Sequence, residues 1–519
     1  MKSPYFNEDH VLFRRSVKDF VDREVRPHIE EWEKQEQIPR AVWKKMGDLG
    51  FLGLNYPEKY GGSEADFFYS VAFVEELARC GAAGLPAAVS VHQYMATAHI
   101  SEAGSEELKE KYLKPAIAGD MIAALAISEP HAGSNVAGIK ARAVKEGDHY
   151  IVNGSKTFIT NGVYSDFVTT AVVTDPDAGV GGISLMVIDK NTPGFTTNKL
   201  KKMGWHSSDT GELFFENVRV PASNLIGQEG RGFYYIMDSF QLERLVGAIM
   251  AVGGCEDTLE TTLGYMKERE AFGRPIAKFQ ALRHKIADLA AETESLKQFV
   301  HHTAWLHQQG EFAVKQCSMA KLLGSELGKK VADECLQMFG GYGYMQDFTI
   351  ERMYRDARVG TIVGGTSEIM REIISKTVID DTNYDSAYKE DHKPKAQTNK
   401  QETKAAPVMD KKPEVAKEII RSLESRFRPE KAGDFEAIFH FDIAGNNGGQ
   451  FTAVIGNGEC KVKEGHEGDA TCTVATKDTV YEEIELGKRN PEMAVMMGKI
   501  KISNIGEMLK FSKLFYRLF

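Results

Sequence analysis

The stretch "QMFGGYGYMQDFTIERMYRD", residues 337–356, decides the fold class of this chain. Its glycines superficially suggest a dinucleotide-binding fingerprint, but that fingerprint must follow a β-strand and open a helix. Here the helical apolar period of residues 313–341 predicts a long helix that the glycines close. A Rossmann fold is therefore rejected.

Outward from this stretch, the helical period covers residues 233–380 and includes a second long helix over 277–310. Residues 122–232 predict a β domain instead. In "GDHYIVNGSKTFITNG", two β-prone runs are joined by Asn153-Gly154, which is a strong signal for a two-residue hairpin. The run "DFVTTAVVTDPDAGVGGISLMVIDK" adds two more strands around a Gly/Asp/Pro loop.

Residues 1–121 predict a helical domain. Phe13, Val17, Phe20 and Val21 fall on one face of a helix, with the spacing of an amphipathic segment. The order along the chain is therefore helical, β and helical again.

Past residue 380 the composition changes twice. Residues 381–414 are rich in Lys, Gln, Thr and Pro and poor in large apolar side chains, which predicts a flexible linker. Residues 415–519 then predict a smaller α/β unit: a helix, four strands, and helical runs over 478–488 and 492–502.

Composition limits the function. The net charge of −10, without any long Lys/Arg run, argues against a nucleic-acid partner. Six cysteines without CxxC pairs favour free thiols in a reducing compartment and no metal site. The N-terminus lacks an apolar signal region, and no apolar run approaches the roughly 18 residues needed to span a bilayer. We expect a cytoplasmic protein that is not an integral membrane protein.

Two polar stretches of the β domain could hold a planar cofactor. In "AISEPHAGSN" (126–135), the hydroxyls of Ser128 and Ser134 and the backbone N–H groups could bind a heterocycle or a phosphorylated tail. In "KTFITNG", Phe158 and Thr160 could flank a flavin ring. Taken alone, the first stretch is more typical of an ordinary Ser/Gly turn, and the second is as typical of a strand end.

In this order, however, the stretches are specific. Residues 1–380 resemble the acyl-CoA dehydrogenase family: "ISEPHAGSN" and residues 337–356 are similar to its two signatures. "REAFGRPIAKFQ" (269–280) is similar to its cofactor-binding stretch, and "GGTSEI" (364–369) to its C-terminal FAD loop. The resemblance implies a multidomain fold with an α-helical domain, a β-barrel-like middle domain and an α-helical bundle. One departure is Asn135, where the first signature usually ends in Asp.

The resemblance also implies a function. It implies FAD, an acyl-CoA substrate, and α,β-dehydrogenation to trans-2-enoyl-CoA in fatty acid β-oxidation or related catabolism. An electron-transfer flavoprotein is the implied electron acceptor. Because part of the FAD site would cross a subunit interface, a homo-oligomer, tetramer or dimer, is implied as well.

The site residues carried over from the family fall into two groups. Ser128 would lie against the flavin pyrimidine, Phe158 beside the isoalloxazine, Thr160 near N5, and Ser134 toward the CoA arm. The implied cofactor-binding residues are Ser128, Phe158, Thr160, Arg269, Phe272, Gln280, Gln337, Gly341, Thr366 and Glu368. The implied substrate-binding residues are Ser134, Arg244, Gly364 and Gly365.

The catalytic base is not where many family members carry it. That glutamate stands immediately before the "GT" of the C-terminal loop, and here the position is Gly364. Glu243, in the apolar surroundings of "DSFQLERLVGAIM", resembles the base of the long-chain and isovaleryl branches, and burial there would raise its pKa. A Glu-Arg pair on a helix is usually a solvated salt bridge, but the missing carboxylate at 364 favours Glu243 as base. Arg244 would position the substrate, and the Gly364 N–H would bind the thioester carbonyl.

Residues 415–519 resemble the sterol carrier protein type 2 (SCP2) lipid-binding domain, which implies a bound fatty acid or lipid. Its apolar side chains at helical spacing could line a tunnel or simply form a core. These side chains are Met493, Met496, Met497, Met508, Phe511 and Phe515. The domain could deliver acyl-CoA to the dehydrogenase or dock it to a membrane or partner.

Other interpretations remain open. An acyl-CoA oxidase would use oxygen as the acceptor, and a non-catalytic lipid carrier with a degenerate dehydrogenase scaffold would explain Gly364 and Asn135. Residues 85–100 are expected to form the floor of the acyl pocket, but acyl chain length and branching do not follow from the sequence.

Overall fold

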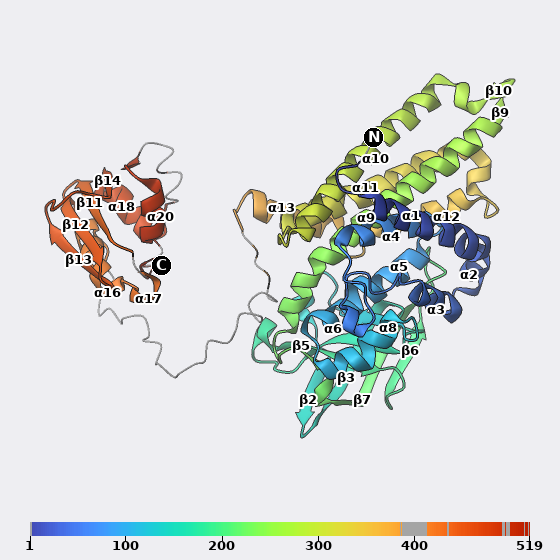
Figure 1. Ribbon diagram of the computed structural model, residues 1–519, viewed down its shortest axis with the longest axis horizontal. Coiled ribbons are helices and arrows are strands. Elements are labelled where there is room, and N and C mark those ends of the chain that lie inside the picture. Colours follow the sequence, from blue (N-terminus) through green and yellow to red (C-terminus); the bar gives the residue numbers. More distant parts are fainter. Residues whose placement is uncertain are drawn as a thin grey trace. The chain divides into compact units, whose positions relative to one another are not determined.

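The computed structural model divides the chain into two compact units, residues 1–394 and 395–519 (Figure 1). Each unit is described by itself. The structure describes residues 3–382, 384, 386, 413–432, 435–489, 494, 499–512, 514–516 and 518. The linker predicted over 381–414 therefore lies largely outside the described residues.

The first unit begins with helices that pack on one core. Val17, Phe20 and Val21 are buried and Phe13 packs against the same core, which confirms the predicted apolar face. A π-helical turn, η4 (His92–Ala96), joins two of the helices. The α-helices are α1 (Glu8–Phe20), α2 (Ile29–Gln35), α3 (Arg40–Asp48), α4 (Phe67–Leu77), α5 (Gly84–Val91), α6 (Thr97–Ala103), α7 (Glu106–Leu108) and α8 (Lys114–Ile117).

An eight-stranded sheet follows, in the order β6-β7-β3-β2-β4-β5-β8, with β1 parallel to β4. The two strands predicted around the Gly/Asp/Pro loop are present as β4 and β5, and they pair antiparallel. The strands are β1 (Ala123–Ala126), β2 (Arg142–Glu146), β3 (His149–Thr160), β4 (Phe167–Val173), β5 (Ile183–Asp189), β6 (Phe195–Lys199), β7 (Thr210–Pro221) and β8 (Leu225–Ile226).

The hairpin predicted at Asn153-Gly154 is wrong. Strand β3 runs straight through this pair, and the turn lies instead between Glu146 and His149, which face each other across β2 and β3. The pairing of β3 with β7 shifts register between Val152 and Gly154, so the pair marks a bulge rather than a turn. A Cβ at Gly154 would lie 2.7 Å from the backbone of the neighbouring chain segment, which is why glycine stands there.

The rest of the first unit is a helical bundle. The predicted helix closed by glycines is confirmed: α11 ends at Phe339 and Gly340 follows at φ +59°. A short hairpin of β9 (Glu270–Ala271) and β10 (Arg274–Pro275) lies at the end of the α9–α10 pair, far from the large sheet (Figure 1). The helices are α9 (Gly232–Glu268), α10 (Gln280–Gln308), α11 (Val314–Phe339), α12 (Thr349–Ala357) and α13 (Ser367–Val378).

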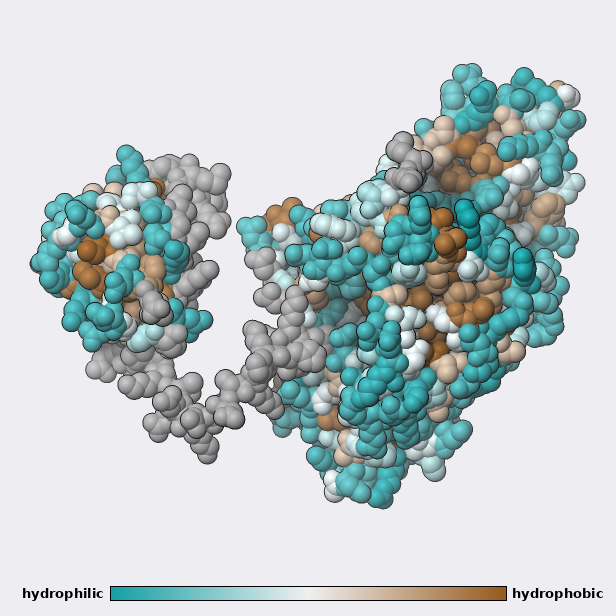
Figure 2. Space-filling model, in the orientation of Figure 1, coloured by the Kyte–Doolittle hydropathy of each residue, from teal (hydrophilic) through white to brown (hydrophobic). Residues whose placement is uncertain are grey.

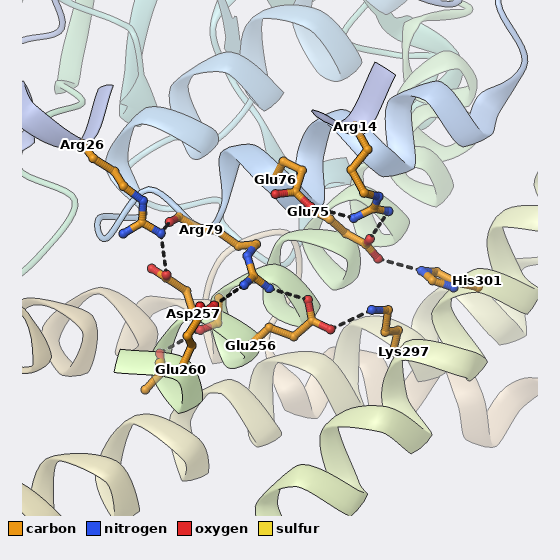
Figure 3. Close-up of polar contacts among 12 residues, drawn as sticks. Arg14, Arg26, Glu75, Glu76, Arg79, Glu256, Asp257, Glu260, Lys297 and His301 are labelled. Carbon is orange, nitrogen blue, oxygen red and sulfur yellow. Dashed lines mark hydrogen bonds and ion pairs between the residues drawn. The ribbon is translucent and has the colours of Figure 1, made fainter. Parts of the chain in front are cut away.

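A network of buried charges holds the N-terminal helices on this bundle (Figure 3). Glu75 on α4 is fully buried; its carboxylate lies 2.6 Å from Arg14 Nη2 on α1 and 2.7 Å from His301 Nε2 on α10. Beside it, Glu256 on α9 accepts from Arg79 at 2.8 Å and from Lys297 at 2.7 Å. These contacts cross from one helical layer to the other.

The second unit has a five-stranded sheet in the order β13-β12-β11-β14-β15, and its helices enclose a separate apolar core. Strands and helices appear where the sequence predicts them, with one correction given below. The elements are α15 (Ala416–Arg421), α16 (Leu423–Arg426), α17 (Pro429–Ala432), β11 (Ala437–Ala444), β12 (Gly449–Gly456), β13 (Glu459–Glu464), β14 (Cys472–Lys477), α18 (Asp478–Glu485), β15 (Ile500–Ile502) and α20 (Ile505–Ser512).

The helix predicted over residues 492–502 is wrong at its end. Ile500–Ile502 form strand β15, antiparallel to β14, because the Ile-Lys-Ile alternation suits an edge strand. Phe511 and Phe515 are part of the core and Met508 packs against it, while Met493, Met496 and Met497 lie outside the described residues. Within the described residues of both units, none of the helices is long and apolar enough to cross a membrane.

Candidate functional site

Glu243 lies on the first turns of α9, where the helix leaves the sheet domain. Its side chain is buried, and Ser239, one turn earlier, donates from Oγ to Glu243 Oε1 at 3.3 Å. Burial raises the pKa of Glu243 to about 7, against the opposing effects of the Arg244 charge and the Ser239 hydrogen bond. The burial and the raised pKa expected from the apolar sequence context are confirmed.

Arg244 is buried beside it but does not neutralise it through a short ion pair. Its Nη1 donates to Gln241 Oε1 at 3.1 Å, and its Nε has no hydrogen-bond partner in the described part of the chain. Burial lowers the pKa of Arg244. A buried guanidinium with a spare donor is suited to hold a polar group of a ligand.

The glycine-rich loop before α13 is tied to this region through Lys321 on α11. Lys321 Nζ donates to the carbonyl oxygen of Gly365, and burial, followed by the nearby charge of Arg244, lowers its pKa to about 8. Gly364 has a φ of +62°, and a Cβ there would meet nothing within 4 Å. The structure thus brings the loop and the Glu243-Arg244 pair to one region and leaves open space at Gly364.

Thr366 and Glu368 open α13. Thr366 is the N-cap, and its hydroxyl accepts from Ile369 N at 3.3 Å. Glu368 is exposed in the first turn, and hydrogen bonds from its own backbone N–H and from Thr366 lower its pKa. A capped helix start with a left-handed glycine pair before it leaves backbone N–H groups directed toward a ligand.

A second group of site residues lies in the sheet domain. The Ser128 carbonyl, just after β1, accepts from Thr157 N at 3.0 Å, which brings the Ser128 loop against the end of β3 that carries Phe158 and Thr160. Phe158 is 72% exposed and has a φ of +61°, a conformation that non-glycine residues seldom adopt. Such local strain is typical of functional sites.

A buried ion pair holds these two segments together. Lys156 Nζ, on β3, lies 2.8 Å from Glu129 Oε1 and donates to the Ile127 carbonyl at 3.0 Å. Burial lowers the pKa of Lys156 to about 8, against the charge of Glu129. Ser134, further along the same loop, is exposed.

A third group lies at the far end of α9. Arg269 follows the helix, and its guanidinium carbon is 5.4 Å from the ring centroid of Tyr342 in η10 (Gly340–Tyr344), so the 269–280 stretch and the glycine-rich end of α11 meet. Phe272 is 96% exposed, with a φ of +53°. Gln280, Gln337 and Gly341 are exposed in the same part of the bundle.

A cavity of about 440 Å³ lies between the N-terminal helices and the bundle. Ser239, the hydrogen-bond partner of Glu243, is in its wall, so the cavity extends from the Glu243 turn toward the start of α9. Gln93, Tyr94 and Ala98 also line it, which confirms that part of the 85–100 region lines this pocket.

Several residues of these sites escaped the sequence analysis. Ser239 and Lys321 carry no motif of their own, and Lys156 looks like an ordinary strand lysine in the sequence. Helical spacing could have found only Ser239, which stands four residues before Glu243. Within the described residues, there is no cluster of side chains able to hold a metal ion.

Comparisons with known proteins complete the picture. Family models described as the N-terminal, middle and C-terminal domains of acyl-CoA dehydrogenase match residues 7–120, 124–218 and 230–379, and one described as the SCP-2 sterol transfer family matches 417–516. The mouse (Mus musculus) mitochondrial long-chain specific acyl-CoA dehydrogenase is 41% identical over 380 residues, which are 73% of this chain and 88% of the relative.

Two solved structures are similar to the first unit. An acyl-CoA dehydrogenase from Geobacillus kaustophilus has a TM-score of 0.71 and 44% identity, covering 73% of this chain and all of that one. A glutaryl-CoA dehydrogenase from Mycobacterium smegmatis, in complex with FADH2, has a TM-score of 0.69 and 29% identity over 73% of this chain and 97% of that one. The chain therefore belongs to the acyl-CoA dehydrogenase family and carries, after the dehydrogenase part, a domain of the SCP-2 sterol transfer family.

Proposed function

We propose that this protein catalyses the FAD-dependent α,β-dehydrogenation of acyl-CoA thioesters to trans-2-enoyl-CoA, with Glu243 as the base. The observation that carries the proposal is the buried Glu243 carboxyl, whose pKa of about 7 matches the requirement of a general base at neutral pH. The family membership supports the reaction class, and the missing carboxylate at Gly364 leaves Glu243 to perform the proton transfer.

Removal of the α-proton leaves negative charge on the thioester oxygen, so the site must bind that oxygen. We assign this to the backbone N–H of Gly364, and the spare Nε donor of Arg244 supplies a second positive group nearby. The open space at Gly364 gives a carboxylate from α9 room to approach the substrate. Glu243 then holds the proton on its carboxylate, and burial in an apolar wall keeps water away from it.

The residues of the sheet domain fit a flavin. An exposed aromatic side chain at a left-handed φ, Phe158, stands beside the hydroxyl residues Ser128 and Thr160, and we propose that these three hold the ring system. When bound, FAD supplies the acceptor for the hydride that leaves the β-carbon. The proposed holders of the rest of FAD are Arg269, Phe272, Gln280, Gln337, Gly341, Thr366 and Glu368. Ser134, Arg244, Gly364 and Gly365 are the proposed substrate-binding residues.

We propose that the protein is a homo-oligomer and that an electron-transfer flavoprotein reoxidises it. Arg269 is 26 residues beyond Glu243 on and after one continuous helix, which separates the two by about 40 Å, so they cannot serve the same cofactor within one chain. Apolar surface gathers over the helical part of the first unit, whereas the sheet end is mostly hydrophilic (Figure 2). Phe272, Tyr344 and Ile379 are among the exposed apolar side chains there, which fits an interface between copies.

The Glu243→Gln variant tests the base. We expect it to bind FAD normally but to lose exchange of the substrate α-proton and anaerobic bleaching of the flavin by acyl-CoA, with turnover reduced on the order of a hundredfold or more. Glu260→Gln, on the exposed side of the same helix, is the matched control and should leave turnover unchanged. Near-normal turnover in Glu243→Gln would refute the assignment.

For the second unit we propose that the SCP-2 family domain binds a fatty acyl group and supplies it to the dehydrogenase. Deleting residues 415–519 should raise the KM for long-chain acyl-CoA and leave the KM for short-chain acyl-CoA and the kcat unchanged, since the core of the first unit is separate. Steady-state kinetics of both proteins provide the measurement. An unchanged KM for long-chain substrate would leave docking to a membrane or partner as the role of the domain.

A further inference from the structure

The cavity beside Glu243 has a polar interior. Gln93 and Tyr94, on η4, are only 2% and 3% exposed, and both line the cavity. Neither the amide nitrogen of Gln93 nor the hydroxyl of Tyr94 has a hydrogen-bond partner of normal geometry within the described residues. Buried donors of this kind need a partner, and here only the contents of the cavity are left to provide one.

The orientation of the Gln93 amide follows from its surroundings. Its Oε1 accepts from the backbone N–H of Gly53 at 3.1 Å, so the NH₂ group is the end that remains. The Tyr94 hydroxyl lies beside it, near Ser70, and burial raises the pKa of Tyr94, which keeps the hydroxyl protonated and able to donate. The two side chains therefore present adjacent donors.

The rest of the wall is mixed. Leu54, Phe67, Leu242 and Phe312 supply apolar surface that suits an alkyl chain. Asp66, Glu102, Asp238 and Glu311 place four carboxyl groups around the same cavity. This charge disfavours an anionic group, so the phosphates of CoA and a second carboxylate on the acyl chain are both unsuited to it.

We propose that the substrate is an acyl-CoA whose acyl chain carries a neutral oxygen function, a hydroxyl or a carbonyl, that accepts hydrogen bonds from Gln93 and Tyr94. The inference rests on the proposed function, because it assigns this cavity to the acyl chain of the substrate of Glu243. A plain alkyl chain would displace water from the two donors and leave them unpaired, so the cavity discriminates against it.

The test compares matched pairs of acyl-CoA: octanoyl, decanoyl and dodecanoyl thioesters and their ω-hydroxy derivatives, with the FAD-loaded full chain. We expect kcat/KM to favour the hydroxylated member by about tenfold or more for at least one chain length. The Tyr94→Phe variant, which removes a single oxygen, should lower kcat/KM for that hydroxylated substrate and leave the plain one unchanged or improved. Tyr69→Phe, a half-buried tyrosine outside the cavity wall, is the control and should change neither.

Gln93→Met provides an independent variant and should reduce the same preference. Equal kcat/KM for all plain and hydroxylated pairs, or an equal loss for both substrates in Tyr94→Phe, would overturn the inference, as would a preference for thioesters with a terminal carboxylate. If no acyl-CoA of any kind bleached the flavin, the proposed function itself would fail and the inference with it.

Discussion

At the scale of single residues, the chemistry of this site depends on how Glu243 is surrounded. The carboxyl is buried without a short ion pair, and the one hydrogen bond that favours its ionised form comes from Ser239. The base must be ionised to accept a proton, so turnover should rise with pH through about 7, the pKa of Glu243. A neighbour that alters this pKa should therefore move the pH dependence.

Ser239→Ala tests this. The hydrogen bond from Ser239 lowers the pKa of Glu243, so its removal should raise that pKa and shift the acidic limb of the kcat profile to higher pH. The kcat of the variant on the high-pH plateau should stay close to that of the parent protein. Ser295→Ala, whose hydroxyl donates to its own exposed helix, is the control. A shift to lower pH would contradict the proposed role of Glu243.

At the scale of elements, the N-terminal helices are fixed to the bundle by the buried carboxylate of Glu75 on α4. Burial alone would raise the pKa of Glu75, but the hydrogen bond with His301 and the charge of Arg14 outweigh it and lower the pKa to about 2. Because the pKa is lower in the folded state, the ionised group stabilises the fold above the ordinary glutamate pKa of 4.5. That stabilisation disappears as the pH falls from about 4.5 toward 2.

The Glu75→Gln variant should therefore be less stable at neutral pH, by on the order of 3 kcal/mol of unfolding free energy. The difference from the parent protein should narrow as the pH falls below 4.5, because the parent loses the same interaction by protonation. Urea unfolding of the first unit at several pH values provides the measurement, with the exposed Glu294→Gln as control. A gap that stays constant with pH would show that Glu75 does not act through its charge.

At the scale of the whole molecule, the site is incomplete in one chain if FAD binds as proposed. The ring-binding residues and the base lie toward the start of α9, and Arg269 and Phe272 lie about 40 Å away at its other end. In a homo-oligomer the distal group of one copy would complete the site of another.

Mixed oligomers test that arrangement. Glu243→Gln and Arg269→Ala chains should each be inactive as pure oligomers, the second because FAD is held poorly. Co-expressed, they should regain part of the activity, since a site with an intact base from one chain and Arg269 from the other is complete. Activity and FAD content of the purified mixed oligomer are the readouts, and pure parent protein sets the full value. No recovery despite verified mixed assembly would contradict a shared site.

The sequence by itself determined the order of helical and β regions, the long helix closed by Gly340, and the identity of the site residues, because periodicity and residue type are local properties. It misassigned Asn153-Gly154, since that pair suits a hairpin turn and a bulge equally, and only the pairing with β7 chose the bulge. Likewise the run ending in Ile500–Ile502 became a strand because β14 offered an edge. Only the tertiary structure decided the burial that raises the pKa of Glu243, the link from Lys321 to the Gly365 loop, and the polar wall at Gln93 and Tyr94. Desolvation and hydrogen-bond partners depend on which distant segments meet, and no local pattern records that.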